Sequence, residues 1–219
     1  MSNIASWLDS ACAPFDHAIL EFWHTVAEAA GSFLTPFMEL VSLTGDKGIM
    51  LLVLGLILMC FSKTRKAGVS VFFAICCGAI ITNITLKPLI ARVRPYEASA
   101  TLREFWEFVG ASPESDLSFP SGHATATAAA MVGLVWAKGK KFLWLCIPYV
   151  ALMCISRNYL MVHYPTDVLA GVISGAIGAT VAYCIVRVIY RRAEASPDGK
   201  FNRFLLTFNI TDLFRSKAN

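Results

Sequence analysis

The sequence carries little charge for its length. Asp, Glu, Lys and Arg make up only 16% of the 219 residues, whereas hydrophobic residues make up 56%. Typical soluble domains contain about 25% charged residues, so this composition excludes an ordinary soluble domain. It also excludes a disordered chain, a collagen and a coiled coil. The mean hydropathy of +0.59 agrees, and we expect a protein embedded in a membrane.

Metal-binding and disulfide patterns are also missing. The chain has seven cysteines but no CxxC pair, and most of them lie in apolar runs, where cysteine acts as a small hydrophobic residue. No His/Cys spacing is typical of zinc, and no group of Asp and Glu suggests magnesium. We therefore expect no metal and no other cofactor. Met1–Cys12 lacks a basic region followed by an apolar core, so we expect no cleaved signal peptide.

Five apolar stretches are candidates for membrane crossings. A helix needs about 20 apolar residues to cross the hydrocarbon core, and these stretches approach that length with their flanking residues. A sixth segment, Phe15–Thr44, is interrupted by glutamates, and it is either an interfacial amphipathic helix or the first span. The segments predict an all-α fold, an integral membrane helical bundle of about six transmembrane helices. The five stretches are Gly48–Ser62, Ala67–Leu86, Phe119–Ala137, Phe142–Ser156 and Val168–Val186.

The domain organisation follows from the same segments. Residues 1–192 form a single predicted membrane-embedded domain, and residues 193–219 form a predicted cytoplasmic tail with an amphipathic helix. In the last apolar stretch, Gly171, Gly175 and Gly178 recur at near-helical spacing. Such spacing of small residues is typical of helices that pack closely in a membrane, so we expect a helix-packing face there.

The basic residues predict the orientation of the chain. Three basic clusters flank the spans, and short basic loops mark the cytoplasmic side of a membrane protein. Six alternating spans place all three clusters on that side, with both termini cytoplasmic. Five further cations then lie on the outer face, against this rule, so another reason must place them there; they are Lys87, Arg92, Arg94, Arg103 and Arg157. The three clusters are Lys63, Arg65 and Lys66; Lys138, Lys140 and Lys141; and Arg187, Arg191 and Arg192.

The first of three motifs on the outer face runs from Lys87 to Arg94-Pro95. Lys87 ends a span, and Pro95 interrupts regular structure. Taken alone, this motif is a basic stop-transfer cluster whose long side chains reach the headgroups. Such a cluster belongs on the other side of the membrane, which favours binding of an anion instead.

The second motif is Pro120-Ser121-Gly122-His123, followed by an alanine-rich run. Pro and Ser favour the start of a helix, and Gly lets a ligand approach the backbone closely. Free N–H groups at a helix N-terminus bind anions. The motif therefore predicts either an ordinary helix start or an anion site.

The third motif runs from Ser156-Arg157 to His163 and Asp167. His163 and Asp167 are four residues apart, so they would share one face of a helix, although Pro165 interrupts a continuous one. An Asp bonded to one ring nitrogen fixes the tautomer of a His and leaves the other nitrogen free. The alternative is a helix cap beside an interfacial histidine.

The three motifs together favour phosphate chemistry. Their cations, two histidines, one carboxylate and a helix start fall on the same predicted face, where charged groups are costly and usually functional. Lys, Arg and backbone N–H groups suit a phosphate. Two histidines can supply a nucleophile and an acid.

This motif set resembles the type 2 phosphatidic acid phosphatase (lipid phosphate phosphatase) superfamily, in its six-span membrane branch. Vanadium-dependent haloperoxidases and soluble bacterial acid phosphatases are similar in these motifs, but the apolar spans argue against both. Three blocks match without departure: Lys87 to Arg94-Pro95, Pro120 to His123, and Ser156-Arg157 to His163 and Asp167.

The resemblance implies the roles of the site residues. It implies metal-independent hydrolysis through a phosphohistidine, with His163 as the nucleophile and Asp167 as its orienting partner. It also implies that His123 first protonates the leaving oxygen and then activates water. The implied phosphate ligands are Lys87, Arg94, Arg157, Ser121 and the backbone N–H of Gly122.

The resemblance further implies a lipid substrate that carries a phosphomonoester or a terminal pyrophosphate. We expect undecaprenyl pyrophosphate, because an outward-facing phosphatase in a bacterial cytoplasmic membrane suits recycling of a cell-wall lipid carrier. Phosphatidylglycerophosphate and phosphatidate are the alternatives, and a non-catalytic lipid-binding or transport protein is the alternative of another class. We expect no nucleic-acid partner and no obligate protein partner.

One segment outside the motifs bears on the substrate. Tyr96–Asp116 is expected to form a loop or short helix over the pocket. Its aromatic residues Phe105, Trp106 and Phe108 suit the membrane interface. The segment is therefore either an interfacial anchor or a gate for the lipid.

Overall fold

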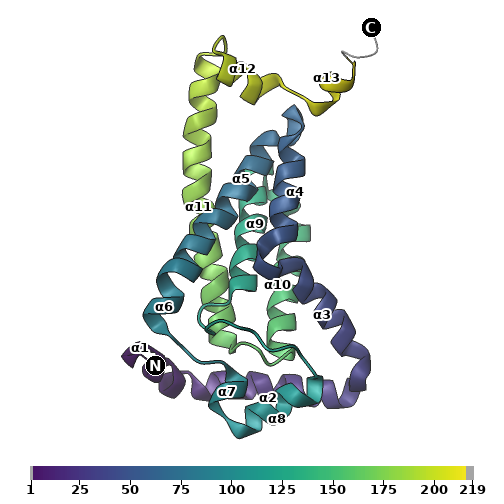
Figure 1. Cartoon of the computed structure of the whole chain (residues 1–219), viewed down its shortest axis with the longest axis vertical. Coiled ribbons are helices and arrows are strands. Elements are labelled where there is room, and N and C mark those ends of the chain that lie inside the picture. The colour runs from purple at the N-terminus through teal and green to yellow at the C-terminus, as the bar shows by residue number, and fades with distance from the viewer. Residues whose placement is uncertain (1, 216–219) are drawn as a thin grey trace.

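The computed structural model describes residues 2–215, and within them every regular element is a helix. This confirms the predicted all-α class. Figure 1 shows a bundle of helices with further helices lying across one of its ends. The bundle helices are α3 (Leu34–Gly45), α4 (Ile49–Met59), α5 (Ser62–Ala79), α9 (Gly122–Lys138), α10 (Leu143–Tyr159) and α11 (Pro165–Ala195).

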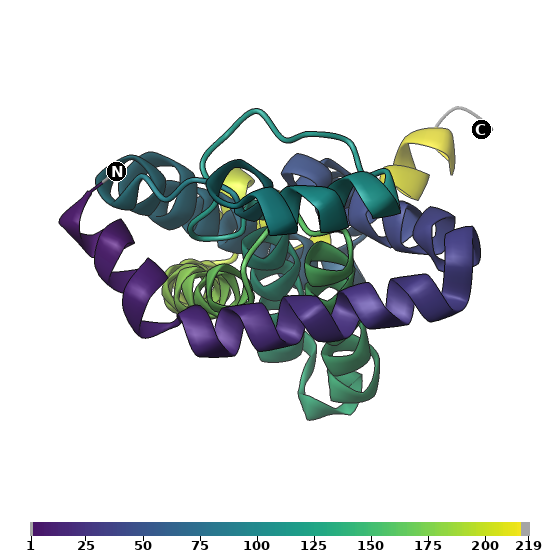
Figure 2. The ribbon, with the colours of Figure 1, turned by 90° about the horizontal axis from the view of Figure 1, so that it is seen from below.

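Other helices lie at the two ends of the bundle. Seen from below, α2 runs across one end of the bundle with α8 beside it (Figure 2), and two helices follow α11 at the other end (Figure 1). These other helices are α1 (Asn3–Ala11), α2 (Ala13–Ala30), α6 (Lys87–Ile90), α7 (Pro95–Ala98), α8 (Ala100–Val109), α12 (Lys200–Thr207) and α13 (Ile210–Arg215). The remaining turns are η1 (Gly31–Phe33), η2 (Asp46–Gly48), the π-helical η3 (Ile80–Leu86) and η4 (Lys140–Phe142).

Helix α9 forms the centre of the bundle, and α5 and α11 are its most extensive neighbours. Its alanine run is almost wholly buried, and small side chains let the neighbouring backbones approach it. A methyl group on Gly171 would lie 2.6 Å from the carbonyl oxygen of Ser121, and one on Gly175 would lie 2.4 Å from that of Thr125. The predicted helix-packing face of α11 is therefore confirmed: Gly171 and Gly175 pack against α9, and Gly178 packs against Gly78 of α5.

Four segments are long and apolar enough to cross a membrane, where the sequence predicts about six spans. The difference arises because Phe15–Thr44 is split at η1: α2 lies across the end of the bundle, and α3 continues into α4 as one crossing. Phe119–Ala137 becomes the central helix α9. Large apolar side chains remain exposed on the outside of the bundle, as lipid contact requires. The four segments are Leu34–Met59, Ser62–Ala98, Lys140–Tyr159 and Pro165–Ala195.

The two ends of the bundle differ in composition. We call the end crossed by α2 and α8 the α2 end. The other, called the basic end, holds the predicted basic clusters: Lys138 donates to the backbone oxygen of Lys63 at 2.6 Å, and the Lys66 ammonium lies over the Tyr190 ring of α11. Helix α1 lies at the α2 end and α13 at the basic end (Figure 1). The prediction that both termini share one side is therefore wrong, because α2 does not cross.

Helix α12 of the C-terminal segment is amphipathic. In α12, Leu205 is buried against the bundle while Phe201 and Phe204 are exposed. The tail is fixed by Arg65, whose guanidinium donates to the backbone oxygens of α12 and of Phe208. The last part of the predicted tail, residues 216–219, lies outside the described residues.

Candidate active site

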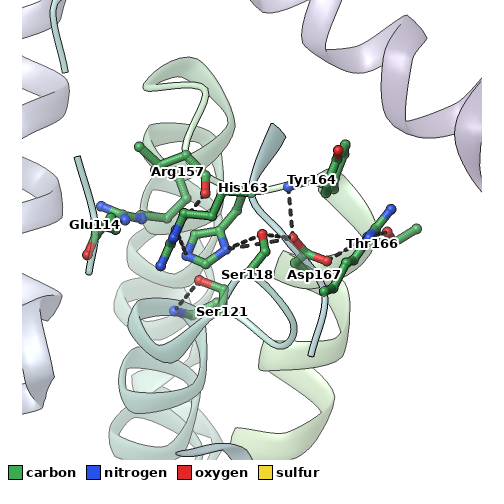
Figure 3. Close-up of polar contacts among 12 residues, drawn as sticks. Glu114, Ser118, Ser121, Arg157, His163, Tyr164, Thr166 and Asp167 are labelled. Carbon is green, nitrogen blue, oxygen red and sulfur yellow. Dashed lines mark hydrogen bonds and ion pairs between the residues drawn. The ribbon is translucent and has the colours of Figure 1, made fainter. Parts of the chain in front are cut away.

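His163 and Asp167 meet through a serine at the α2 end. Asp167 Oδ2 lies 3.7 Å from His163 Nδ1, and the Ser118 hydroxyl lies between the two side chains (Figure 3). The Ser118 hydroxyl donates to Asp167 Oδ2, and its oxygen is 3.4 Å from His163 Nδ1. Since a hydroxyl has one hydrogen and donates it here to the carboxylate, it can only accept from the ring. This favours the tautomer with the proton on Nδ1 and the lone pair on Nε2.

The local sequence explains how this pair forms. Pro165 opens α11 at its first position, where its missing N–H costs nothing. Asp167 is then in the first turn, and its carboxylate accepts the N–H of Tyr164 at 3.0 Å. His163 precedes the helix, so it shares no helix face with Asp167. The pair is made by the turn and the helix start, and not by i,i+4 spacing along a continuous helix.

A single cavity of about 280 Å³ gathers residues from all three motifs. His163 comes from the turn before α11, His123 and Gly122 from the start of α9, and Lys87 from the start of α6, directly after the π-helical turn η3. Arg94 reaches the same cavity, with its Nη1 at 3.3 Å from His163 Nε2. The lone pair of His163 therefore faces a space that is lined by two cations and a helix N-terminus.

The clamp cations are paired with carboxylates from the loop before α9. Lys87 and Arg94 both bind Asp116, and Arg157 binds Glu114. Burial alone would raise the pKa of the Asp116 carboxyl, but the hydrogen bond and charge of Lys87, together with Arg94, lower it below its ordinary value. Two anionic groups thus stand where anions are most strongly favoured in the site.

His163 is almost completely buried, with 1% of its surface exposed. Burial holds the pKa of its imidazole well below the ordinary 6.5, and the charges of Arg94, Arg157 and Lys87 act in the same direction. The ring is therefore neutral at physiological pH, and its Nε2 lone pair accepts from Arg94 Nη1 at 3.3 Å. A neutral imidazole beside fixed cations is suited to attack on an electrophile that carries negative oxygens.

The remaining predicted site residues have other positions. Arg157 lines an adjoining cavity of about 270 Å³ that shares His123 and Glu114 with the first. It donates to Ser42 of α3 and Glu114, and its Nε has no partner within the described chain. Ser121 is fully buried, and its hydroxyl caps α9 by accepting the N–H of Ala124 at 3.5 Å. The Ser121 side chain therefore supports the helix start that presents Gly122.

Strained turns position the site. Among the described residues, three non-glycine positions have positive φ: Lys47 at 48°, Ala91 at 52° and Met161 at 58°. Each adjoins the site: Lys47 lines the first cavity, Ala91 precedes Arg92, and Met161 is two residues before His163. Such conformations cost about 1–3 kcal/mol each and concentrate at functional sites.

Several side chains of the site lie outside the motifs. Ser118, Glu114 and Asp116 come from a loop with no periodicity, and Asp46 of η2 lies 3.8 Å from His123 Nε2. Arg92, already noted as a cation on the wrong face, is buried next to Asp167. The nearest signal in the sequence is the excess of basic residues on this face. This excess predicts anionic partners, but it does not identify which residues they are. Within residues 2–215, no group of three or more His, Cys, Asp or Glu side chains could hold a metal ion.

The chain is similar to several known proteins. The sequence model of the PAP2 superfamily matches residues 67–191, which is more than half of the chain. A decaprenylphosphoryl-5-phosphoribose phosphatase of Mycobacterium tuberculosis is 39% identical over 107 residues, covering 48% of this chain and 53% of the relative. An undecaprenyl-diphosphatase of Sulfolobus acidocaldarius is 28% identical over 143 residues, covering 65% of this chain and 66% of the relative. The chain thus spans about half to two thirds of these relatives.

A solved structure has a similar fold. The crystal structure of a transmembrane PAP2-type phosphatidylglycerolphosphate phosphatase from Bacillus subtilis superposes with a TM-score of 0.64. It is 24% identical and covers 85% of this chain and 92% of that chain. At this identity the likeness concerns the fold, and it extends beyond the segment matched by the superfamily model.

Proposed function

The chain belongs to the PAP2 superfamily, and we propose that it is a membrane phosphatase that hydrolyses a phosphate ester or anhydride on a lipid through a phosphohistidine. One observation carries the proposal: Lys87, Arg94, His123 and His163 line a single cavity although they are separated by up to 76 residues of sequence. Such a meeting of two imidazoles and fixed cations suits a transferring phosphoryl group.

In the first step, His163 Nε2 attacks phosphorus in line with the leaving oxygen. A new P–N bond forms while the bond from phosphorus to that oxygen breaks, and His123 gives its proton to the leaving oxygen. The proton on His163 Nδ1 stays within reach of Ser118 and Asp167, so the positive charge that develops on the ring is stabilised.

In the second step, water hydrolyses the phosphohistidine. His123, now neutral, accepts a proton from the water as its oxygen attacks phosphorus, and the P–N bond breaks to restore His163. Lys87, Arg94 and the N-terminus of α9 bind the non-bridging phosphoryl oxygens throughout. Arg157 completes this clamp from the adjoining cavity.

Substrate binding requires the loop carboxylates to release the cations. The Asp116 carboxylate binds the ammonium of Lys87 and the guanidinium of Arg94, and these two groups would bind the phosphate. A phosphate dianion carries more charge than a carboxylate and offers more acceptor oxygens. The phosphate therefore displaces Asp116, and the loop closes again on the cations after the product leaves.

We assign the substrate to polyprenyl-linked phosphates, with undecaprenyl pyrophosphate first. Two relatives are named for decaprenyl- and undecaprenyl-linked substrates, and the adjoining cavities offer room beyond one phosphate. The alternative, phosphatidylglycerophosphate or phosphatidate, is favoured by the similar fold of the Bacillus subtilis phosphatase.

The chain crosses the bilayer five times in this proposal, through α3–α4, α5, α9, α10 and α11, with α2 lying at the interface. The basic end faces the cytoplasm by the distribution of Lys and Arg, so the cavity opens on the outer face of a bacterial cytoplasmic membrane. In a cysteine-free background, Ser99→Cys should react with an impermeant reagent from outside, and Gly139→Cys should not. The reverse labelling would contradict this orientation.

A substrate panel tests the function. The purified full chain in detergent, with excess chelator, should release phosphate from undecaprenyl pyrophosphate faster than from dioctanoyl phosphatidate or phosphatidylglycerophosphate. Faster release from the glycerolipids would favour the alternative substrate class. Absence of release from all three would favour a non-catalytic lipid-binding or transport protein. Activity that is lost with chelator and restored by magnesium would contradict metal-independent chemistry.

A further inference from the structure

Arg92 joins the N-terminal helices to the proposed nucleophile pair. The Arg92 side chain is 1% exposed, and each of its three guanidinium nitrogens donates to a different carboxylate. Nη1 donates to Asp167 Oδ1 at 2.6 Å, Nη2 to Asp16 Oδ2 at 2.9 Å, and Nε to Asp9 Oδ1 at 2.7 Å. Asp9 lies in α1, Asp16 in α2, and Asp167 at the start of α11. Three distant segments therefore converge on one cation.

Asp16 also holds the first turn of α11 directly. Its two oxygens accept the backbone N–H of Thr166 at 2.9 Å and the Thr166 hydroxyl at 2.7 Å. The same hydroxyl accepts from Arg92 at 2.8 Å. Thr166 and Asp167 are consecutive residues at this helix start (Figure 3). By binding Thr166, Asp16 therefore fixes the backbone from which the Asp167 side chain extends. Asp16 is itself fully buried.

The charges of this cluster add up to an excess of anions. One guanidinium faces the carboxylates of Asp9, Asp16 and Asp167, which gives a formal sum of +1 and −3, or −2, when all three are ionised. With Arg92 bound to Asp167 alone, the guanidinium would neutralise the carboxylate that faces His163. Because Asp16 and Asp9 bind the other two edges, one guanidinium charge is shared among three carboxylates, and the charge of Asp167 is only partly compensated when it is ionised.

We propose that Asp16, acting through Arg92 and Thr166, is a positioning residue that sets the orientation and charge of Asp167 toward His163. The inference rests on the proposed function, because it assigns Asp16 to the phosphorylation step. Asp9 and Asp16 precede the segment matched by the superfamily model, whereas Arg92 and Asp167 lie inside it. The N-terminal helices thus contribute to the reaction without contacting the phosphate.

The test compares two fully buried positions of α2. Asp16→Asn keeps the side-chain shape and removes the charge, while Leu20→Ala removes apolar packing and leaves every charge and hydrogen bond of the Arg92 cluster in place. Wild type and variants in detergent are assayed with undecaprenyl pyrophosphate and dioctanoyl phosphatidate for kcat, KM and melting temperature. Rapid quenching with ³²P-labelled substrate measures the rate of phosphoenzyme formation.

For Asp16→Asn we expect kcat and the rate of phosphoenzyme formation to fall about 10- to 100-fold, as for other groups that orient a reacting side chain, with KM within about twofold. For Leu20→Ala we expect a lower melting temperature and an unchanged kcat for the folded fraction. Asp9→Asn, whose carboxyl is partly exposed, should fold and show a smaller fall in kcat in the same direction.

Other results overturn the inference. A fall in melting temperature without a fall in kcat in Asp16→Asn or, if that variant does not fold, in Asp9→Asn would leave the cluster a purely structural role. Equal losses of kcat in Asp16→Asn and Leu20→Ala would mean the same. A wild-type chain that turns over neither lipid contradicts the proposed function itself, and that outcome is distinct from both.

Discussion

Both ends of the bundle carry arginine and lysine, but in different surroundings. At the α2 end, Lys87, Arg92, Arg94 and Arg157 are buried, and each of them binds at least one carboxylate. At the basic end, Arg65 is also buried, with 3% exposed, but its partners are backbone oxygens. The same residue types thus have anionic partners at one end and neutral partners at the other.

The two ends differ in whether the partners of their buried cations can be replaced by another anion. A backbone oxygen is part of the fold, so Arg65 cannot release its partners without undocking the tail. The carboxylates of Asp116 and Glu114 lie on a loop, with 53% and 27% of their side chains exposed, and another anion can replace them. Buried cations with replaceable anionic partners favour ligand binding, whereas buried cations with fixed partners favour structure.

Substitution of the two histidines at the α2 end should have the largest effect on activity. We expect His163→Ala and His123→Ala each to lower kcat on the order of 10³-fold or more, as for groups that act as a unit. The measurement is phosphate release from undecaprenyl pyrophosphate by purified, folded variants. Lys63→Ala at the basic end is the matched control and should keep the wild-type rate. Normal turnover in either histidine variant would contradict the assignment of the active site.

Asp167→Asn should have the next largest effect. An amide cannot stabilise the positive charge that develops on His163, so we expect kcat to fall about 10²- to 10⁴-fold, with KM little changed. Rapid-quench measurement of phosphoenzyme formation locates the defect at the first step. A raised KM with a normal phosphorylation rate would contradict an orienting role for this carboxylate.

Asp116→Asn tests whether the Asp116 carboxylate competes with other anions for Lys87 and Arg94. Removal of its charge frees Lys87 and Arg94 for other anions, so inhibition by vanadate should strengthen. We expect the inhibition constant to fall about two- to fivefold, the range for a partly exposed ion pair. Asp198→Asn, an exposed change near the basic end, is the control. Weaker inhibition in Asp116→Asn would mean that this carboxylate supports the anion site.

Arg65→Ala should have the smallest effect on activity. Its loss leaves backbone oxygens of α12 without their donor, and we expect the free energy of unfolding to fall by about 1–3 kcal/mol. The kcat of the folded protein should stay within about twofold, because Arg65 lies at the end away from the cavity. Thermal unfolding and turnover of the same preparation measure both quantities. A large loss of kcat with normal stability would show that the two ends are coupled.

The motif residues of the site were predictable, and the arrangement of the N-terminal segment was not. Lys87, Arg94, His123 and His163 were placed on one face by counting spans, and they do share one cavity. The sequence leaves Phe15–Thr44 open between the two alternatives, because a transverse amphipathic helix and a tilted span have the same composition. Only the packing of α2 across the bundle distinguishes them, and this packing also reverses the side on which the N-terminus lies.

Hydropathy, charge distribution and motif spacing are local along the chain, so they are enough to predict a helical membrane protein with a phosphate-binding set of residues. Which anions pair with those cations depends on contacts between distant segments of the fold. Asp9, Asp16, Glu114 and Asp116 are ordinary acidic residues in the sequence, and no spacing relates them to Arg92, Lys87 or Arg157. Their meeting depends on α1, α2 and the loop before α9 lying over the end of the bundle, where these carboxylates pair with the buried cations.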